Sequence, residues 1–337
     1  MKKALTFILL SCWSFLSYSQ HISERDEAEL SRKEDSMKAY SIKIIQGINS
    51  KDRFGADSIF TRILVRALRT RNSFYYPFDS LETISKLYAP DSSFRIYTWQ
   101  MVINDLVTRQ HGAIQMRTED GSLKLFPLID KSDITKNIAD TIGNNMGWIG
   151  AVYYRIIQKQ YRDKNYYTLL GYDEHTISSN RKIIEVLSFN NGEPVFGGRY
   201  FSFEKDTVAR GGVNRYVMEY KKEAGARLTY DPDMDMIVFE HLISETNEPN
   251  KKWTLVGDGD YEGFTWVNGK WVHVEKIFHY VTPEGKEPVP KPMRDAQGNI
   301  LDEPPKPFDN TGEDKPEPVK TKTKTTIRKN KVKTKGG

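Results

Sequence analysis

The sequence predicts an α+β protein dominated by strands, with N-terminal helices packed on a large antiparallel meander sheet or half-barrel and a disordered basic C-terminal tail. Three observations predict this class. Between residues 20 and 72, after a leader at 1–19, apolar residues recur at helical spacing. From 73 to 280, runs rich in β-branched and aromatic residues follow one another across short turns, so neighbouring strands should run antiparallel. Residues 281–337 are rich in proline and lysine, which is typical of an unpacked segment.

Two helices are expected in the N-terminal region. The first has a charged start that we expect to fray, followed by apolar residues at helical spacing: Met37, Tyr40, Ile44 and Ile48. We expect the second helix to begin after Asp57, whose side chain can accept a hydrogen bond from the first turn as an N-cap. An apolar stripe from Ile59 to Ala67 follows Asp57.

Strand character begins after Pro77. Residues 94–102 are apolar on both faces, as expected of a central strand, and residues 112–129 predict a hairpin. In that hairpin we expect one buried face to contain Ile114, Met116, Leu123 and Leu125. A helix is expected from Ser132 to about Asn145, and two further series of strands are expected at 148–203 and 214–243.

The strongest hairpin signal is Asn268-Gly269, because both residues of a two-residue turn need positive φ and these residue types accept it. Such a turn fixes the register of the strands that it joins. Trp266 should face Trp271, and Phe264 should face His273. These four side chains should share one face of the hairpin, and we interpret them as candidate binding residues.

The entry to this hairpin matches half of a calcium-binding loop. Asp258, Asp260 and Glu262 occupy alternate positions before Gly263, as the first ligands of such a loop do. The twelfth position is Gly269, where the loop requires a bidentate glutamate. Calcium is therefore the one cofactor that the sequence suggests, and a polar turn leading into a strand is the competing interpretation.

Known catalytic motifs are absent from the sequence, which has no HExxH, no GxSxG, no glycine-rich phosphate loop and no dinucleotide-binding fingerprint. Two similar triplets end in histidine, and they supply the candidates for a metal-assisted hydrolytic site: Asp173, His175, Glu240 and His241. The triplets lie far apart in the sequence, so their spacing does not support convergence. We therefore expect a protein without enzymatic activity.

Residues 1–19, MKKALTFILLSCWSFLSYS, have the organisation of a signal peptide: two lysines, an apolar run and small residues near the end. We expect export to the periplasm or outer membrane, with cleavage before Gln20. Lipidation at Cys12 is the alternative, and it is disfavoured because Leu10 is bulky for a lipoprotein box. Cys12 is the single cysteine, so the cleaved chain could form neither disulfides nor thiolate metal sites. No later segment is apolar enough to form a membrane-spanning helix.

The basic charge of the chain is concentrated in the tail. The net charge is +5, of which the leader contributes two lysines and the tail eight basic residues, so residues 20–317 carry −5. The eight are Lys320, Lys322, Lys324, Arg328, Lys329, Lys331, Lys333 and Lys335. Unstructured basic segments bind anionic surfaces through counterion release, so we expect the tail to contact an anionic envelope surface. A solubilising tail is the alternative, and nucleic acid is not an expected partner.

Several segments resemble a family of exported, uncharacterised proteins of the Bacteroidota: FYYPFDSLETISKLYAPDSSFRIYTWQ (74–100), GSLKLFPLID (121–130), YYTLLGYDE (166–174), GEPVFGG (192–198) and DGDYEGFTWVNGKWV (258–272). The resemblance covers most of residues 55–280. It implies secretion and a shared fold, but it brings no known activity and no catalytic residues. The FYYPFD segment is also similar to a periplasmic component of the gliding and type IX secretion apparatus.

Together these observations predict an exported, non-enzymatic envelope protein. Its β-rich module would bind a protein or glycan partner while the basic tail contacts an anionic surface. Two alternatives stay open: a metal-assisted hydrolase, and a structural or assembly subunit of an envelope secretion or motility machine.

Overall fold

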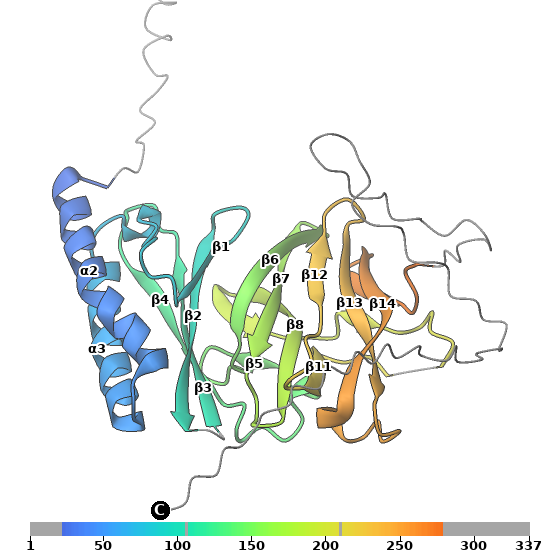
Figure 1. The fold of residues 1–337 in the computed structure, drawn as a ribbon. Coiled ribbons are helices and arrows are strands. Elements are labelled where there is room, and N and C mark those ends of the chain that lie inside the picture. Colours follow the sequence, from blue (N-terminus) through green and yellow to red (C-terminus); the bar gives the residue numbers. More distant parts are fainter. Residues whose placement is uncertain (1–21, 105–106, 209–210, 279–337) are drawn as a thin grey trace, which may run out of the picture. The chain divides into compact units, whose positions relative to one another are not determined.

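A computed structural model describes residues 22–104, 107–208 and 211–278 of the chain. Strands dominate these residues, and the two α-helices lie at the N-terminal end (Figure 1). The β-dominated α+β class predicted from the sequence is therefore confirmed. The predicted signal peptide, which includes Cys12, and the Lys-rich tail lie outside the described residues.

Each of the two helices begins with a side-chain cap. α2 (Glu24–Gln46) follows Ser23, whose hydroxyl accepts a hydrogen bond from a first-turn amide, so the expected frayed start is not observed. α3 (Ser50–Leu68) follows Asn49, which caps its first turn in the same way. The prediction of Asp57 as the N-cap is wrong, because Asn49 starts the helix earlier and Asp57 is buried inside it.

The first sheet has four antiparallel strands in the order β1 (Ser85–Tyr88), β2 (Phe94–Asn104), β3 (Val107–Met116) and β4 (Lys124–Ile129). One face of this sheet is covered by α2 and α3. β2 is buried on both faces along most of its length, as predicted for a central strand. The other face of the sheet packs on the second sheet.

The second sheet is built, in spatial order, from β5 (Gly143–Asn144), β9 (Glu193–Phe196), β8 (Ser179–Asn190), β7 (Lys164–Asp173) and β6 (Val152–Tyr161), and β11 (Tyr216–Lys221) pairs with the first half of β8. The third sheet follows the order β10 (Phe201–Ser202), β15 (Lys270–Val274), β14 (Leu255–Val267), β13 (Met236–Ser244) and β12 (Leu228–Asp231). β10 pairs with β15 in parallel, whereas the other pairs of these sheets are antiparallel.

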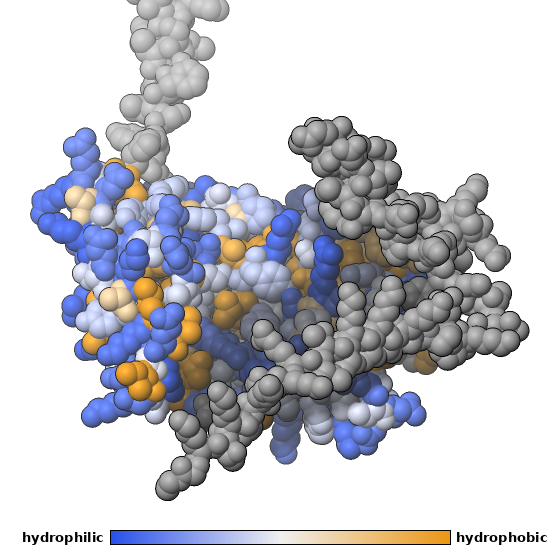
Figure 2. Space-filling model, in the orientation of Figure 1, coloured by the Kyte–Doolittle hydropathy of each residue, from blue (hydrophilic) through white to orange (hydrophobic). Residues whose placement is uncertain are grey.

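The sheets follow the helices as successive layers (Figure 1). Three apolar cores join the layers: one between the helices and the first sheet, one between the first and second sheets, and one between the second and third sheets. The strands that the sequence predicted as one meander or half-barrel are thus divided among three sheets. The face drawn in Figure 2 is mostly hydrophilic over the helical layer, with separate apolar patches, as is ordinary for protein surfaces.

The helix expected from Ser132 to about Asn145 does not form. The segment contains turns, the short 3₁₀ helix η3 (Ile138–Asp140) and β5. Its backbone carbonyls bond to residues outside the segment. The carbonyl of Ala139 accepts from the amides of Asn214 and Arg215, and the Arg215 guanidinium donates to the carbonyls of Ile138 and Thr141. These tertiary bonds replace the bonds within the segment that a helix would need.

The register predicted for the Asn268-Gly269 hairpin is confirmed. β14 and β15 pair Phe264 with His273 and Trp266 with Trp271, and the two turn residues have φ values of 50° and 82°. The indole rings of Trp266 and Trp271 meet edge to face, with centroids 5.2 Å apart. Turn chemistry and strand alternation therefore suffice to place every side chain of this hairpin on its correct face.

Candidate functional site

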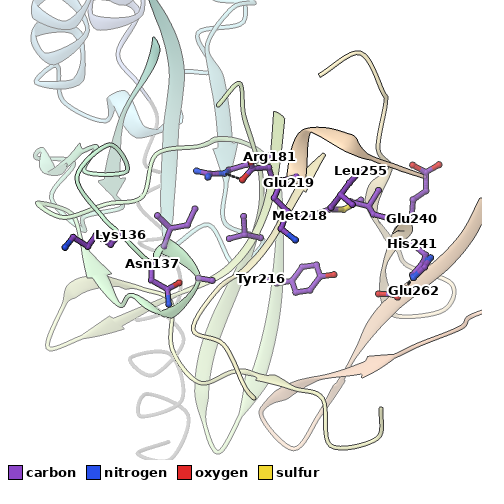
Figure 3. Close-up of a pocket in the computed structure, with 15 residues that line it drawn as sticks. Lys136, Asn137, Arg181, Tyr216, Met218, Glu219, Glu240, His241, Leu255 and Glu262 are labelled. Carbon is purple, nitrogen blue, oxygen red and sulfur yellow. Dashed lines mark hydrogen bonds and ion pairs between the residues drawn. The ribbon is translucent and has the colours of Figure 1, made fainter. Parts of the chain in front are cut away.

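A cleft of about 550 Å³ lies between the second and third sheets (Figure 3). One wall is formed by β11, by Arg181 of β8 and by segment 136–139, which includes part of η3. The opposite wall is formed by β13, by Glu262 of β14 and by the short helix η4 (Lys252–Thr254). The lining carries charged and titratable groups of both signs: Glu219, Glu240, Glu262, His241, Arg181, Lys136 and Lys252.

Two histidines and three carboxylates form a continuous series from the cleft into the core. Asp258 Oδ2 lies 2.8 Å from His241 Nδ1, and His241 Nε2 lies 3.7 Å from Glu262 Oε1. Glu262 Oε2 lies 3.1 Å from His273 Nε2, and His273 Nδ1 lies 2.9 Å from Asp206 Oδ1. The carboxylate of Asp258 therefore orients the ring of His241 at the cleft surface, and Glu262 links that ring to the buried His273.

His273 is held between two carboxylates. Burial lowers its pKa, but the hydrogen bonds and charges of Glu262 and Asp206 together outweigh burial, so the pKa lies above its ordinary value. In the protonated ring both nitrogens donate, one to each carboxylate. The geometry therefore stabilises the imidazolium form.

We expect the folded state to lose stability as the pH rises through the raised pKa of His273. The stabilising contribution is fully present below the unfolded-state pKa of about 6.5 and disappears above the folded-state pKa, because the folded protein then no longer binds an extra proton. Melting temperatures measured across this pH window should fall, and the fall should be smaller in His273→Gln. An unchanged pH profile in His273→Gln would contradict this role.

The wall formed by β8 and β11 contains an ion pair. Arg181 Nε donates to Glu219 Oε2 at 2.8 Å, and Ser179 Oγ donates to Glu219 Oε1 at 2.8 Å. Burial opposes ionisation of Glu219, but these partners outweigh it and lower the pKa of the carboxyl. Glu219 is therefore a fixed anion, which suits recognition of a charged ligand better than proton donation.

The four predicted catalytic residues are only partly brought together. Glu240 and His241 line the cleft, whereas Asp173 and His175 do not. Burial raises the pKa of Asp173 to about 6, and burial followed by the charge of Arg181 lowers the pKa of His175 to about 4. Asp173 ends β7 and His175 follows it, and the charges of Arg181 and Glu219 act on both; neither residue lines the cleft, however, so the predicted four-residue hydrolytic site is not assembled there.

The predicted binding residues lie mostly in the core. Phe264 and Trp271 have no exposed surface, and His273 is 2 % exposed. Trp271 Nε1 donates to Thr168 Oγ1 of β7 at 2.8 Å, so this face of the hairpin packs on the second sheet. The interpretation of all four residues as a binding face is therefore wrong. Trp266 alone among them is partly exposed.

The three carboxylates predicted as calcium ligands are occupied by basic side chains. Asp258 contacts His241, Glu262 contacts His273, and Asp260 Oδ2 accepts from Lys276 Nζ at 3.0 Å. All three lie in β14, where a bulge interrupts the pairing with β13. The segment is therefore a strand and not the loop that the calcium interpretation requires. Within residues 22–104, 107–208 and 211–278, no group of three or more His, Cys, Asp or Glu side chains is arranged to hold a metal ion.

Residues 217–219 of β11 form an edge beside the cleft, and no described strand other than β8 pairs with them. The first four residues of β11, 216–219, line the cleft, and Figure 3 shows Tyr216 pointing across it toward the wall that holds His241 and Glu262. An unpaired edge presents backbone donors and acceptors to an additional strand. The cleft is therefore suited to an extended polypeptide.

Sequence reasoning missed most of the cleft. Arg181 and Glu219 carry no local motif, and only the pairing of β8 with β11 brings them together. A second group was also missed: Asp57 Oδ1 accepts from Trp99 Nε1 at 2.8 Å and lies 2.9 Å from His111 Nδ1. This group joins α3 to the first sheet beside a smaller cavity of about 390 Å³. Its members come from three elements, so no sequence spacing could have identified it.

Among the residues that the structure describes, no helix combines the length and the apolar composition needed to cross a membrane. Comparisons with protein-family models, with curated proteins and with solved structures gave no match. The resemblance to exported proteins of the Bacteroidota therefore stays a prediction.

Proposed function

We propose that this chain is an exported, non-enzymatic binding module of the cell envelope, and that its cleft receives an extended segment of a partner protein. The observation that carries the proposal is the edge of β11 at residues 217–219, which lies beside a charged cleft and with which no described strand other than β8 pairs. A strand added to such an edge gains affinity from main-chain hydrogen bonds, and the pockets beside it select side chains.

The charges of the cleft walls support a polar partner segment. Glu240 and His241 lie on one wall, and Arg181 and Glu219 lie on the other. Successive side chains of an extended ligand point in opposite directions, so alternate residues would meet opposite walls. Because each wall offers both acidic and basic groups, the segment that fits best carries charges of both signs.

A binding role fits this cleft better than hydrolysis does. Glu219 is held as an anion by Arg181 and Ser179, and Glu240 Oε2 accepts from the Arg227 amide at 2.7 Å. A metal-assisted hydrolase would also need Asp173 and His175 at the cleft, where they do not lie. The carboxylates of the cleft are thus engaged by the protein itself, which favours recognition over proton transfer.

Site-specific photocrosslinking in the producing cells tests this proposal. A photoreactive amino acid in place of Lys252, an exposed residue of the cleft, should yield a discrete crosslinked protein. The same substitution at Lys51, an exposed residue of α3, is the matched control and should yield none. No adduct at Lys252, or the same adduct at both positions, would contradict a partner in the cleft.

Fractionation of the same cells tests the remaining part of the proposal. The protein should be recovered from the envelope with Gln20 as its first residue, because the leader is removed on export. High salt should release it, since the contact of residues 320–335 with an anionic surface depends on counterion release. Recovery in the cytoplasm with an intact leader, or retention that salt does not affect, would refute these two elements.

A further inference from the structure

A groove of about 540 Å³ lies where β7 begins and β8 ends. Side chains of both strands and of the segment before β10 line it, and it shares no lining residue with the cleft beside β11. The lining includes three tyrosines, of which Tyr167 is buried, and three amide or hydroxyl side chains: Tyr166, Tyr167, Tyr200, Asn165, Ser188 and Asn190. The groove is therefore a second concave surface with its own chemistry.

The aromatic rings of this groove form a row. The centroids of Tyr166 and Tyr200 are 5.4 Å apart, and those of Tyr166 and Trp266 are 5.9 Å apart. All three side chains are partly exposed, whereas Trp271, which continues the row behind Trp266, is buried. The row thus has a fixed apolar base and exposed ring surface along the groove.

Tyr200 is held in this row by contacts with Trp271 and Gly198. Its carbonyl accepts a hydrogen bond from the Trp271 amide at 2.7 Å, and its ring lies 5.4 Å from that of Tyr166, centroid to centroid. Gly198 has a φ of 147°, and a Cβ at that position would lie 2.4 Å from Tyr200 Cε2. The absence of a side chain at Gly198 therefore gives the tyrosine ring its space, and the ring is held in position before any ligand arrives.

A peptide strand is not the occupant that this groove favours. The backbone of β7 is paired on one side with β6 and on the other with β8, so it offers no edge of the kind that residues 217–219 of β11 form. Recognition must therefore come from side chains, namely aromatic rings and neutral amide and hydroxyl groups, with Lys164 as a charged residue of the lining. A purely apolar lipid chain would leave the amide and hydroxyl groups without partners.

We propose that this groove binds an oligosaccharide. A pyranose ring has apolar C–H faces and a rim of hydroxyl groups, so it can stack on Tyr166 and Tyr200 while its hydroxyls bond to Ser188 and Asn190, which lie on the same face of the sheet as Tyr166. Trp266 extends the stacking surface beyond Tyr166 and provides room for a further sugar unit. The inference goes beyond the protein partner proposed for the cleft and uses none of its residues, so either proposal can fail alone.

Affinity gel electrophoresis of the mature chain, residues 20–337, tests the proposal. The probes are neutral soluble polysaccharides, a panel of α- and β-glucans, mannans, galactans and xylans, so that the basic tail does not contribute to retardation. At least one should retard the wild-type protein. Tyr166→Ala and Tyr200→Ala should each raise the apparent Kd about tenfold or more, because each removes one stacking ring.

Three further variants serve as controls. Tyr166→Phe and Tyr200→Phe keep the aromatic rings and should keep most of the retardation. This result would show that binding depends on ring stacking. Phe54→Ala removes an exposed aromatic ring of α3, outside the groove, and should migrate as wild type. The proposal is overturned if no probe retards the wild type, or if the tyrosine-to-alanine variants are retarded as strongly as Phe54→Ala.

Discussion

Replacing Arg215 with alanine should lower the free energy of unfolding by about 3–5 kcal/mol, because it leaves the buried carboxylate of Glu185 without its cation. Both side chains are fully buried, and Arg215 Nη2 and Nε lie 2.6 Å and 2.7 Å from Glu185 Oε2. Denaturant titration measures this loss. A change below about 1 kcal/mol would show that the carboxylate is neutralised in another way.

The pair is part of a larger buried network. Tyr153 Oη donates to the other oxygen of Glu185 and itself accepts from Trp148 Nε1 at 2.7 Å. Arg215 Nη1 donates to the carbonyls of Ile138 and Thr141 at 2.5 Å and 3.2 Å. Loss of the guanidinium should therefore also loosen segment 138–141 beside the cleft, which amide hydrogen exchange would detect as faster exchange there.

A double variant separates the net contribution of the ion pair to stability from the loss caused by leaving one buried charge unpaired. Glu185→Met with Arg215→Met replaces both charges with apolar side chains and should be more stable than Arg215→Ala, because no buried charge is left unpaired. Lys221→Ala breaks the solvent-exposed pair with Glu245 and is the matched surface control. Its unfolding midpoint should stay close to wild type.

Local features of the fold could be predicted from the sequence, and long-range ones could not. The Asn268-Gly269 turn fixes its own register, and β2 is recognisable because apolar residues occupy both of its faces. Division into three sheets depends on which strands pack against which, and no short stretch of sequence encodes that choice. The expected helix at 132–145 failed for the same reason, since bonds from Arg215 and Asn214 hold its carbonyls.

Register errors have a similar origin when a turn is longer than two residues. In the β3–β4 hairpin, Ile114 faces Phe126, and Met116 faces Lys124, so Leu123 and Leu125 pack on the helical side rather than with Ile114 as expected. The sequence does not fix the length of such a turn, and a shift of one residue moves each side chain to the other face.

The candidate site was only partly accessible to sequence reasoning. Glu240 and His241 were identified because they are adjacent and titratable, and both line the cleft. Their functional neighbours Glu262 and Glu219 come from β14 and β11, and strand pairing alone brings these elements together. Asp173 and His175 were grouped with them by similarity of the triplets, which carries no information about distance.

Replacing Arg95 with alanine should be at least as damaging as breaking the pair of Arg215 and Glu185. Arg95 is fully buried, and its guanidinium donates to two main-chain carbonyls, those of Tyr76 at 2.5 Å and Ser73 at 3.0 Å. It also donates to Tyr88 Oη at 2.6 Å and Gln115 Oε1 at 2.9 Å. Removing it deprives the buried acceptors of Ser73 and Gln115 of this donor, at about 1–3 kcal/mol each, and leaves a cavity, so we expect a loss of about 5 kcal/mol or more.

The charge of Arg95 is compensated chiefly by aromatic faces and oxygen dipoles. The guanidinium carbon lies 4.7–5.8 Å from four ring centroids, those of Tyr97, Tyr88, Phe78 and Phe74. Phe74 and Phe78, together with the carbonyl of Tyr76, belong to the FYYPFD segment, so this segment has a structural role as one side of the cage. Cation–π contacts gain strength when the charge is removed from water, as it is here.

Two substitutions distinguish these contributions. Arg95→Lys keeps the charge over the rings but loses the planar fork, whereas Arg95→Met keeps much of the volume and loses both charge and donors. We therefore expect the unfolding free energy, measured by denaturant titration, to decrease from wild type to Arg95→Lys, then to Arg95→Met, and to be lowest in Arg95→Ala. Arg155, which is exposed and lies 5.5 Å from the ring centroid of Tyr230, is the matched control, and Arg155→Met should change stability little. A methionine variant as stable as the lysine variant would mean that the cage stabilises volume and not charge, and the FYYPFD segment would then act through apolar packing alone.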